Sequence, residues 1–154
     1  MNIYHTRERL RTRSIYDLNL RVAFYARVST DSEDQQVSIE HQTQYYKEFI
    51  KSNRNWKFAK GYIDNGISGI QTKHREQFKE MLEDAKNGKF DIILTKSISQ
   101  FSENVVELLT IVRDLRQHDV AVYFEEESIN TSALNSELLL TVFAELKEEE
   151  RMVC

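Results

Sequence analysis

The chain has one cysteine, no proline and only four glycines among its 154 residues. The cysteine is the last residue, Cys154, so the sequence offers neither a disulfide framework nor a Cys/His cluster for zinc. No apolar run approaches the roughly 18 residues of a membrane span. The first 14 residues contain no apolar signal-peptide core. These absences favour a domain with a hydrophobic core in a reducing setting, and we expect a cytoplasmic protein without metal or membrane contact.

The charge is unevenly distributed along the chain, although the net charge is only −4. In residues 1–30, six arginines oppose two acidic residues, so this end carries +4 and the remaining 124 residues carry −8. Such an end suits approach to a polyanion, and it equally suits a solvated leader. We expect a polar, basic extension over residues 1–20 and one domain over residues 21–154, which together form a fragment of a longer protein.

Strand-like and helix-like segments alternate after this extension. Short β-branched, aromatic or continuous apolar runs predict strands, and amphipathic stretches predict helices. The strands are expected over residues 21–28, 56–63, 90–95 and 120–125, and the helices over residues 37–51, 75–89, 104–118 and 136–152. This order predicts an α/β fold with a mainly parallel sheet flanked by helices, ending in a long C-terminal helix.

Each predicted strand is followed by a polar segment: "ARVST", "DNGISG", "KSISQFSEN" and "EESINT". Ligand sites of open α/β sheets lie at the carboxyl ends of the strands. We therefore expect these four segments to face one shared cleft.

Tyr25, Arg27 and Ser29 alternate along the first predicted strand, so their side chains point to one face. An arginine within a strand fit for burial needs an anionic partner. A serine hydroxyl beside a guanidinium suits attack on a phosphate, because the guanidinium holds the phosphate oxygens. The alternative is a plain strand end in which Arg27 pairs with Asp64.

Asp64 closes the second predicted strand, and the glycines after it fit either a phosphate-binding loop or, more simply, a structural turn. Arg75 begins the next helix, where a cation is unfavourable against the helix dipole, so its guanidinium is expected to be used elsewhere. Phosphate-loop, dinucleotide-binding and H-E-x-x-H motifs are absent. The histidines at 41, 74 and 118 are too far apart to suggest a metal site.

Taken together, the motifs resemble the serine recombinases, the resolvase/invertase group, and most nearly the large serine recombinases of phages and mobile elements. The likeness extends from about Arg21 to Arg151. It rests on the order and spacing of "YARVST", "SIEHQ", "DNGISG" with Arg75, "DIILTKSIS", "VYFEEESINT" and "LLLTVFAEL".

The resemblance implies a catalytic domain for site-specific DNA recombination, which cuts and rejoins DNA through a 5′-phosphoserine link without a cofactor. Ser29 is then the nucleophile, and Arg27 and Arg75 hold the scissile phosphate. Gln42 and Asp64 match further polar residues of the site, and Tyr25 shares the face of the nucleophile. The remaining candidates are Lys96 and Ser99 in the loop after the third strand and the pair Glu150 and Arg151 on the last helix.

The resemblance also implies partners. These are DNA and other recombinase chains, in a homodimer, a tetramer or a hetero-oligomer. The final helix serves subunit pairing in the family, which suits its apolar residues Leu139, Val142, Phe143 and Leu146.

The segment "KSISQFSEN" departs from the family pattern. Two arginines are usual in this loop, and here Gln100 and Glu103 occupy their positions, whereas Phe101 and Asn104 fit. Losing one such cation costs on the order of 10²–10⁵ in rate. We therefore predict weak or absent cleavage by this chain alone. A cleavage-deficient subunit that assists an active recombinase is the alternative, and a nucleotide- or phosphate-binding α/β module is the alternative outside the family.

Overall fold

The computed structural model describes residues 14–28, 32–65, 75–102, 104–133 and 136–153. Within these ranges, only the backbone is described for residues 32–38 and 147–153. Ser29 and Glu103 lie outside the described residues.

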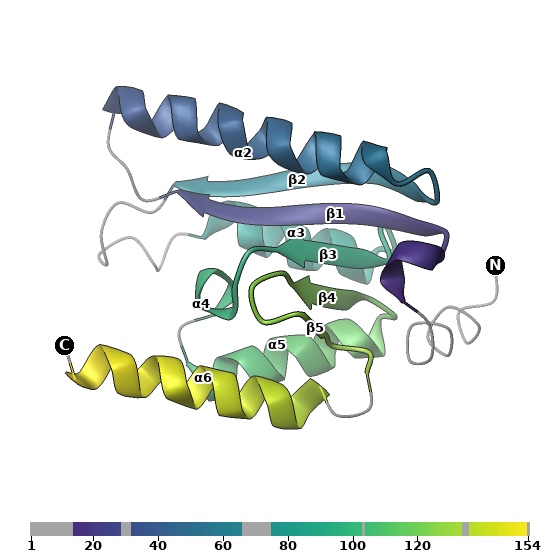
Figure 1. The fold of residues 1–154 in the computed structure, drawn as a ribbon. Helices are drawn as coiled ribbons and strands as arrows, with labels where there is room; N and C mark the ends of the chain where they lie inside the picture. Colours follow the sequence, from purple (N-terminus) through teal and green to yellow (C-terminus); the bar gives the residue numbers. More distant parts are fainter. Residues whose placement is uncertain (1–13, 29–31, 66–74, 103, 134–135, 154) are drawn as a thin grey trace.

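A five-stranded sheet in the order β2-β1-β3-β4-β5 forms the centre of the molecule (Figure 1). The first four strands in the chain are parallel, and only the last is antiparallel to its neighbour. Their bounds are β1 Leu20–Val28, β2 Trp56–Asn65, β3 Ile92–Thr95, β4 Ala121–Phe124 and β5 Ile129–Asn130. The predicted α/β class with a mainly parallel sheet is therefore confirmed.

Helices cover both faces of this sheet (Figure 1). One long helix lies over β1 and β2 on one face, and four helices lie on the other face. The first is α2, Ser32–Ser52, and the others are α3 Glu76–Lys86, α4 Ile98–Phe101, α5 Val105–Gln117 and α6 Ser136–Val153. The long C-terminal helix is thus present as predicted.

The alternation of side chains along β1 divides the core into two parts. Val22, Phe24 and Ala26 point into the cluster under α2, whereas Ala23 and Tyr25 point into the cluster under α3, α4 and α5. All five side chains are almost fully buried. A strand covered on both faces reads as a continuous apolar run, which is why this segment was recognisable in the sequence.

The folded part begins earlier than the boundary expected at residue 20. Ile15 and Leu18 are buried against the α2 side of the sheet, and the indole Nε1 of Trp56 donates to the carbonyl of Ile15 at 2.9 Å. Ile15–Asp17 forms a single 3-10 turn, η1. The polar character of residues 1–20 hid these two buried apolar residues.

Two short elements lie where the sequence predicted only polar loops. The one-turn helix α4 buries Ile98 and Phe101, and β5 adds two residues to the edge of the sheet. Such short elements are formed by tertiary packing rather than by local propensity. The helix α2 begins at Ser32, five residues before the predicted start at Val37.

One edge of the sheet is β2, in which Lys57 and Lys60 are exposed. Lys60 pairs with Glu80 of α3 at 2.9 Å. The opposite edge ends in the two residues of β5. In the described part of the chain, none of the helices has the length and apolarity that crossing a lipid bilayer requires.

Candidate functional site

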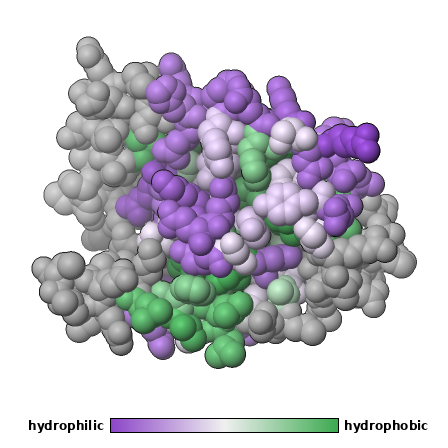
Figure 2. Space-filling view, in the orientation of Figure 1, coloured by the Kyte–Doolittle hydropathy of each residue, from purple (hydrophilic) through white to green (hydrophobic). Residues whose placement is uncertain are grey.

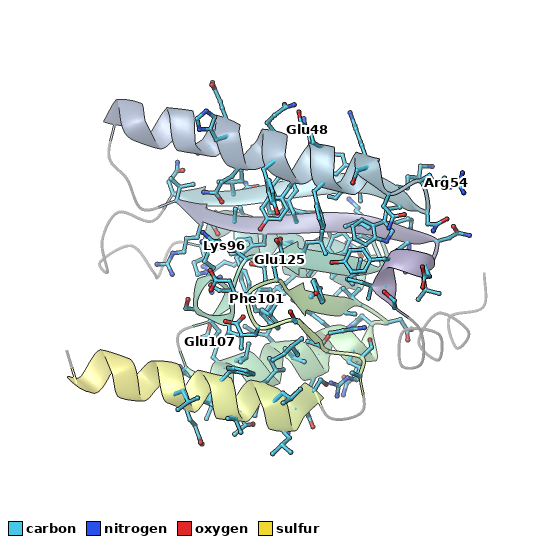
Figure 3. All side chains as sticks on the ribbon, in the orientation of Figure 1. Glu48, Arg54, Lys96, Phe101, Glu107 and Glu125 are labelled. Atoms are coloured by element: carbon cyan, nitrogen blue, oxygen red, sulfur yellow. The ribbon has the colours of Figure 1, made fainter. Side chains whose placement is uncertain are left out.

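The polar side chains predicted to share a cleft come from the carboxyl ends of neighbouring strands. Tyr25 and Arg27 lie near the end of β1, and Asp64 lies near the end of β2 at the register position opposite Arg27. Lys96 follows β3, and Glu125 follows β4. Figure 3 shows Lys96 and Glu125 on adjacent segments at this end of the sheet, with Phe101 and Glu107 close by.

Asp64 joins β2 to the beginning of α3. The carboxylate is buried, and it accepts hydrogen bonds from the Tyr25 hydroxyl at 2.7 Å and from the backbone N–H groups of Gln77 and Phe78 at 2.9 and 3.1 Å. The two N–H groups belong to the first turn of α3, where unpaired donors and the helix dipole both favour an anion. Asp64 therefore fixes the start of α3, which also positions Arg75.

Tyr25 is fully buried between Asp64 and the aromatic core. Burial raises the pKa of its hydroxyl, and the hydrogen bond to Asp64 raises it further, although Arg75 opposes this shift. The phenol therefore stays protonated at neutral pH. Because the hydroxyl of Tyr25 donates its proton to Asp64, its oxygen can accept a hydrogen bond from Arg75.

Arg75 is the N-cap residue of α3, and its guanidinium turns back over the strand ends. Nε donates to the Tyr25 hydroxyl at 3.3 Å, and one terminal nitrogen donates to the carbonyl of Gln100 at 3.2 Å. The other terminal nitrogen is 3.8 Å from a carboxylate oxygen of Glu107 on α5. The guanidinium carbon lies 3.7 Å from the ring centroid of Phe78. The side chain is only 12% exposed and each of its three nitrogens faces a partner, so Arg75 is held in place.

A cavity of about 370 Å³ opens beside this cluster, between α2 and the segments that follow β3 and β4. Gln42, Lys96 and Gln100, which the sequence predicted as site residues, line it. Its remaining lining residues are His41, Tyr45, Tyr46 and Glu125.

Glu125 is held at the wall of this cavity by the backbone. Its N–H donates to the carbonyl of Thr95 at 3.0 Å, and the hydroxyl of Tyr45 approaches its Oε2 at 3.4 Å. Burial raises the pKa of the Glu125 carboxyl, and the phenols of Tyr46 and Tyr45 and the charge of Lys96 oppose that shift. The neighbouring phenols and Lys96 thus compensate only partly for the burial of the charged Glu125 carboxylate.

The structure describes the predicted site residues to different extents. Arg27 is half-buried at the end of β1, and the hydroxyl of Ser99 lies 3.0 Å from that of Ser97. The side chains of Glu150 and Arg151 belong to the part of α6 for which only the backbone is described. Since Ser29 and Glu103 also lie outside the described residues, the predicted nucleophile and one substituted position stay predictions.

The apolar residues of α6 divide into two sets. Leu139 and Phe143 pack against the core of their own domain, whereas Val142 and Leu146 are 46% and 49% exposed. Leu138, which the sequence reading did not select, is 68% exposed. In Figure 2, hydrophobic side chains gather at the lower border of the molecule, where α6 lies. The available apolar face therefore consists of Leu138, Val142 and Leu146.

Sequence reasoning missed the roles of Tyr45, Tyr46 and Glu125. In the sequence, Tyr46 fits the apolar stripe of this helix and Tyr45 lies beside it, and Tyr46 is indeed buried and stacked on Phe24. The available signal was that a buried tyrosine needs a partner for its hydroxyl. Among the residues that the structure describes, no group of three or more His, Cys, Asp or Glu side chains is placed to hold a metal ion.

The fold and this cluster define a resolvase-like α/β domain. The family model described as "Resolvase, N terminal domain" matches residues 22–154. The chain therefore belongs to the resolvase family of serine recombinases, a family of site-specific recombinases.

Individual relatives agree with this assignment. The transposon Tn552 DNA-invertase BinR of Staphylococcus aureus is 30% identical over 129 residues, which are 82% of this chain but only 59% of the invertase. The N-terminal catalytic domain of TP901-1 integrase is 30% identical with a TM-score of 0.58, over 86% of this chain and 98% of that chain. A resolvase family site-specific recombinase from Streptococcus pneumoniae is 28% identical with a TM-score of 0.66, over 87% of this chain and 91% of that chain.

The raised pKa of Glu125 predicts an unusual dependence of stability on pH. Because the folded state binds this proton more tightly than the unfolded chain, the contribution of Glu125 to stability is greatest below its ordinary pKa of 4.5. That contribution is lost as the pH rises through the raised pKa of the folded state. Glu125→Gln, which imitates the neutral acid, is therefore expected to be more stable than the natural chain at neutral pH and equally stable in acid.

Urea denaturation at a series of pH values measures this difference. Glu83→Gln, at an exposed acid on α3 away from this cavity, is the matched control and should follow the natural chain across the series. A Glu125→Gln difference that does not change with pH would contradict the prediction.

Proposed function

We propose that this chain is the catalytic domain of a DNA recombinase in which Ser29 attacks a DNA phosphodiester. The observation that carries the proposal is the placement of Arg75 over the hydroxyl of Tyr25, fixed by Asp64, at the strand end that leads to Ser29. Phosphoryl transfer depends mainly on positioning and on electrostatic stabilisation of the phosphate oxygens. A guanidinium that is held in place beside the strand end is suited to that task once a phosphate displaces the Glu107 carboxylate from it.

In the proposed reaction, the Ser29 oxygen forms a bond to phosphorus while the bond to the 3′ oxygen of the DNA breaks. The serine loses its proton, and the leaving 3′ oxygen gains one. The product is a 5′-phosphoserine ester with a free 3′-hydroxyl, and attack by a 3′-hydroxyl reverses the step. Arg27 and Arg75 stabilise the charge on the phosphate oxygens, and the chemistry calls for no cofactor. Such a reaction serves the integration, excision or transposition of a mobile element in the cytoplasm.

The residues around Arg75 favour a second function. Gln100 and Glu103 stand where the family pattern has arginines, and Arg75 already lies against Glu107. A phosphate must then compete with a carboxylate for Arg75, with two fewer cations to assist. We infer slow cleavage by this chain alone, which is compatible with a structural or regulatory subunit that pairs with an active recombinase.

The proposed partners are DNA and other recombinase chains. The exposed face of α6, formed by Leu138, Val142 and Leu146, offers an apolar surface for subunit pairing as a homodimer, a tetramer or a hetero-oligomer. The nucleotide-binding module outside the family is set aside by the family match.

A covalent-trapping assay tests the proposal. The full-length protein is incubated with DNA that contains its recombination site, quenched in denaturant, and examined for a protein–DNA adduct. We expect a low yield that Ser29→Ala abolishes and that Ser52→Ala, at an exposed serine near the end of α2, leaves unchanged. An adduct that persists in Ser29→Ala overturns the assigned nucleophile. No adduct at all, with DNA binding intact, selects the structural subunit.

A further inference from the structure

The one-turn helix α4 is capped by a residue from a distant part of the chain. In the described part of the chain, the side chain of its N-cap residue, Ser97, makes no capping hydrogen bond. The backbone N–H of Ile98 instead donates to the carboxylate of Glu127, at 3.1 Å. Because the first N–H groups of a helix have no partner inside the helix, Glu127 supplies an acceptor in place of Ser97.

Glu127 belongs to the tight turn that connects β4 to β5 (Figure 1). Two backbone hydrogen bonds join this turn to the segment that precedes α4. The N–H of Glu125 donates to the carbonyl of Thr95 at 3.0 Å, which extends the pairing of β3 with β4. The N–H of Glu126 donates to the carbonyl of Lys96 at 2.8 Å. The carboxylate of Glu127 continues this series and carries it into α4.

The other end of α4 contacts Arg75. The carbonyl of Gln100 accepts a hydrogen bond from a terminal nitrogen of the Arg75 guanidinium at 3.2 Å. A helix of four residues is too short to be stable by itself, so the direction of this carbonyl depends on tertiary contacts. Burial of Ile98 and Phe101 places the turn against the core, and Glu127 fixes its first peptide group.

We propose that Glu127 is a positioning residue for the cleavage reaction: its carboxylate holds α4 in the conformation in which the carbonyl of Gln100 orients Arg75. This role rests on the proposed function, in which Arg75 holds the scissile phosphate. Glu127 acts through the backbone of α4 and needs no contact with the DNA. The cap requires an acceptor oxygen rather than a charge, so Glu127→Gln should keep it and Glu127→Ala should remove it.

The effect on Arg75 can be measured without DNA. In ¹⁵N-labelled protein, NMR follows hydrogen exchange at the backbone amide of Ile98, which reports the cap, and at the Nε–H of Arg75. We expect Glu127→Ala to speed exchange at both groups about fivefold or more, because loss of a side-chain cap makes opening of the turn easier. Glu127→Gln should stay within about twofold of the natural chain.

Two control variants separate this effect from a general loss of stability. Glu126→Ala removes an exposed neighbouring side chain and keeps the backbone bond to Lys96, so it should change neither group. Ser14→Ala removes the side-chain cap of η1, whose hydroxyl accepts from the N–H of Tyr16. It should lower the melting temperature about as much as Glu127→Ala and leave Arg75 unchanged.

The covalent-trapping assay at saturating DNA then measures the consequence for the reaction. Glu127→Ala should lower the rate of adduct formation about tenfold, because catalysis depends on the precise placement of the arginine. DNA affinity should not change, and Glu127→Gln should restore the rate.

Three results overturn the proposal: unchanged exchange at Arg75 in Glu127→Ala, loss of the cap in Glu127→Gln, or equal disturbance of Arg75 by Ser14→Ala. If none of the variants, nor the natural chain, forms an adduct, the proposed cleavage fails. The exchange measurements contain no DNA, so they still decide whether Glu127 positions Arg75.

Discussion

Replacing Gln100 and Glu103 together by arginine is expected to raise the rate of covalent adduct formation by about 10²-fold or more. The carbonyl of Gln100 already lies 3.2 Å from a terminal nitrogen of Arg75, so a side chain at this position begins next to the proposed phosphate site. The added arginines would stabilise the charge that develops on the phosphate oxygens, and the carboxylate of Glu103 would be removed. Gel analysis of quenched reactions with site-containing DNA measures the rate.

The matched control adds the same charge elsewhere. Gln117→Arg with Glu83→Arg also raises the net charge by three, at exposed positions on α5 and α3. This pair should strengthen DNA binding slightly without changing the adduct rate, since distant charges act on association rather than on chemistry. Adding Ser29→Ala to the active pair should abolish the adduct. Unchanged adduct formation in the active pair, with DNA binding intact, would show that these two positions are not the cause of slow cleavage.

Asp64→Asn is expected to lower the free energy of unfolding by about 2–4 kcal/mol. The carboxylate is 7% exposed and accepts from the Tyr25 hydroxyl and from two backbone N–H groups of α3. An amide has only one acceptor oxygen, so its NH₂ group must face a donor and leave it unpaired. The substitution also removes the negative charge from the helix N-terminus.

Chemical denaturation monitored by circular dichroism measures this loss. Asp17→Asn, at an exposed aspartate in η1, makes the same chemical change and should alter stability by less than about 0.5 kcal/mol. Asp64→Asn should also release Arg75, which NMR detects as averaging of its guanidinium resonances. A stable Asp64→Asn protein with Arg75 still ordered would refute the role assigned to this carboxylate.

The architecture was accessible from the sequence because its signals are local and strong. The run that becomes β3 is apolar at its first three buried positions, and α3 and α5 show clear amphipathic periods, so their type and order followed directly. The one-turn helix α4 was missed because it consists of four residues stabilised by burial of Ile98 and Phe101. A segment this short carries no periodicity.

The contacts within the candidate site could not be predicted from the sequence. Arg75 was expected to turn away from the helix it begins, and its contacts with Tyr25 and Gln100 agree with that expectation. The sequence could not indicate that Arg75 donates to the backbone carbonyl of Gln100, because every residue has a backbone carbonyl and none is marked as a partner. The sequence also left open whether Asp64 pairs with Arg27 or belongs to a structural turn. In the structure, its carboxylate accepts hydrogen bonds from two backbone N–H groups in the first turn of α3.

The cavity could not be predicted from the sequence for a different reason. Tyr45 and Tyr46 follow the helical period of α2, and Glu125 begins an acidic run after β4, so each has an ordinary interpretation in the sequence. Only the crossing of α2 over the strand ends brings the phenols to the carboxylate. Contacts between residues some 80 positions apart depend on the assembled sheet.

The edges of the sheet determine how copies of this chain can meet. An open strand edge can pair with another copy by backbone hydrogen bonds, which leads to aggregation. Here the outer strand β2 presents Lys57 and Lys60, and the opposite edge ends after the two residues of β5. Both features discourage fibril-like growth by strand addition. Copies of this chain are then expected to meet through helices, among which α6 presents the exposed Leu138, Val142 and Leu146.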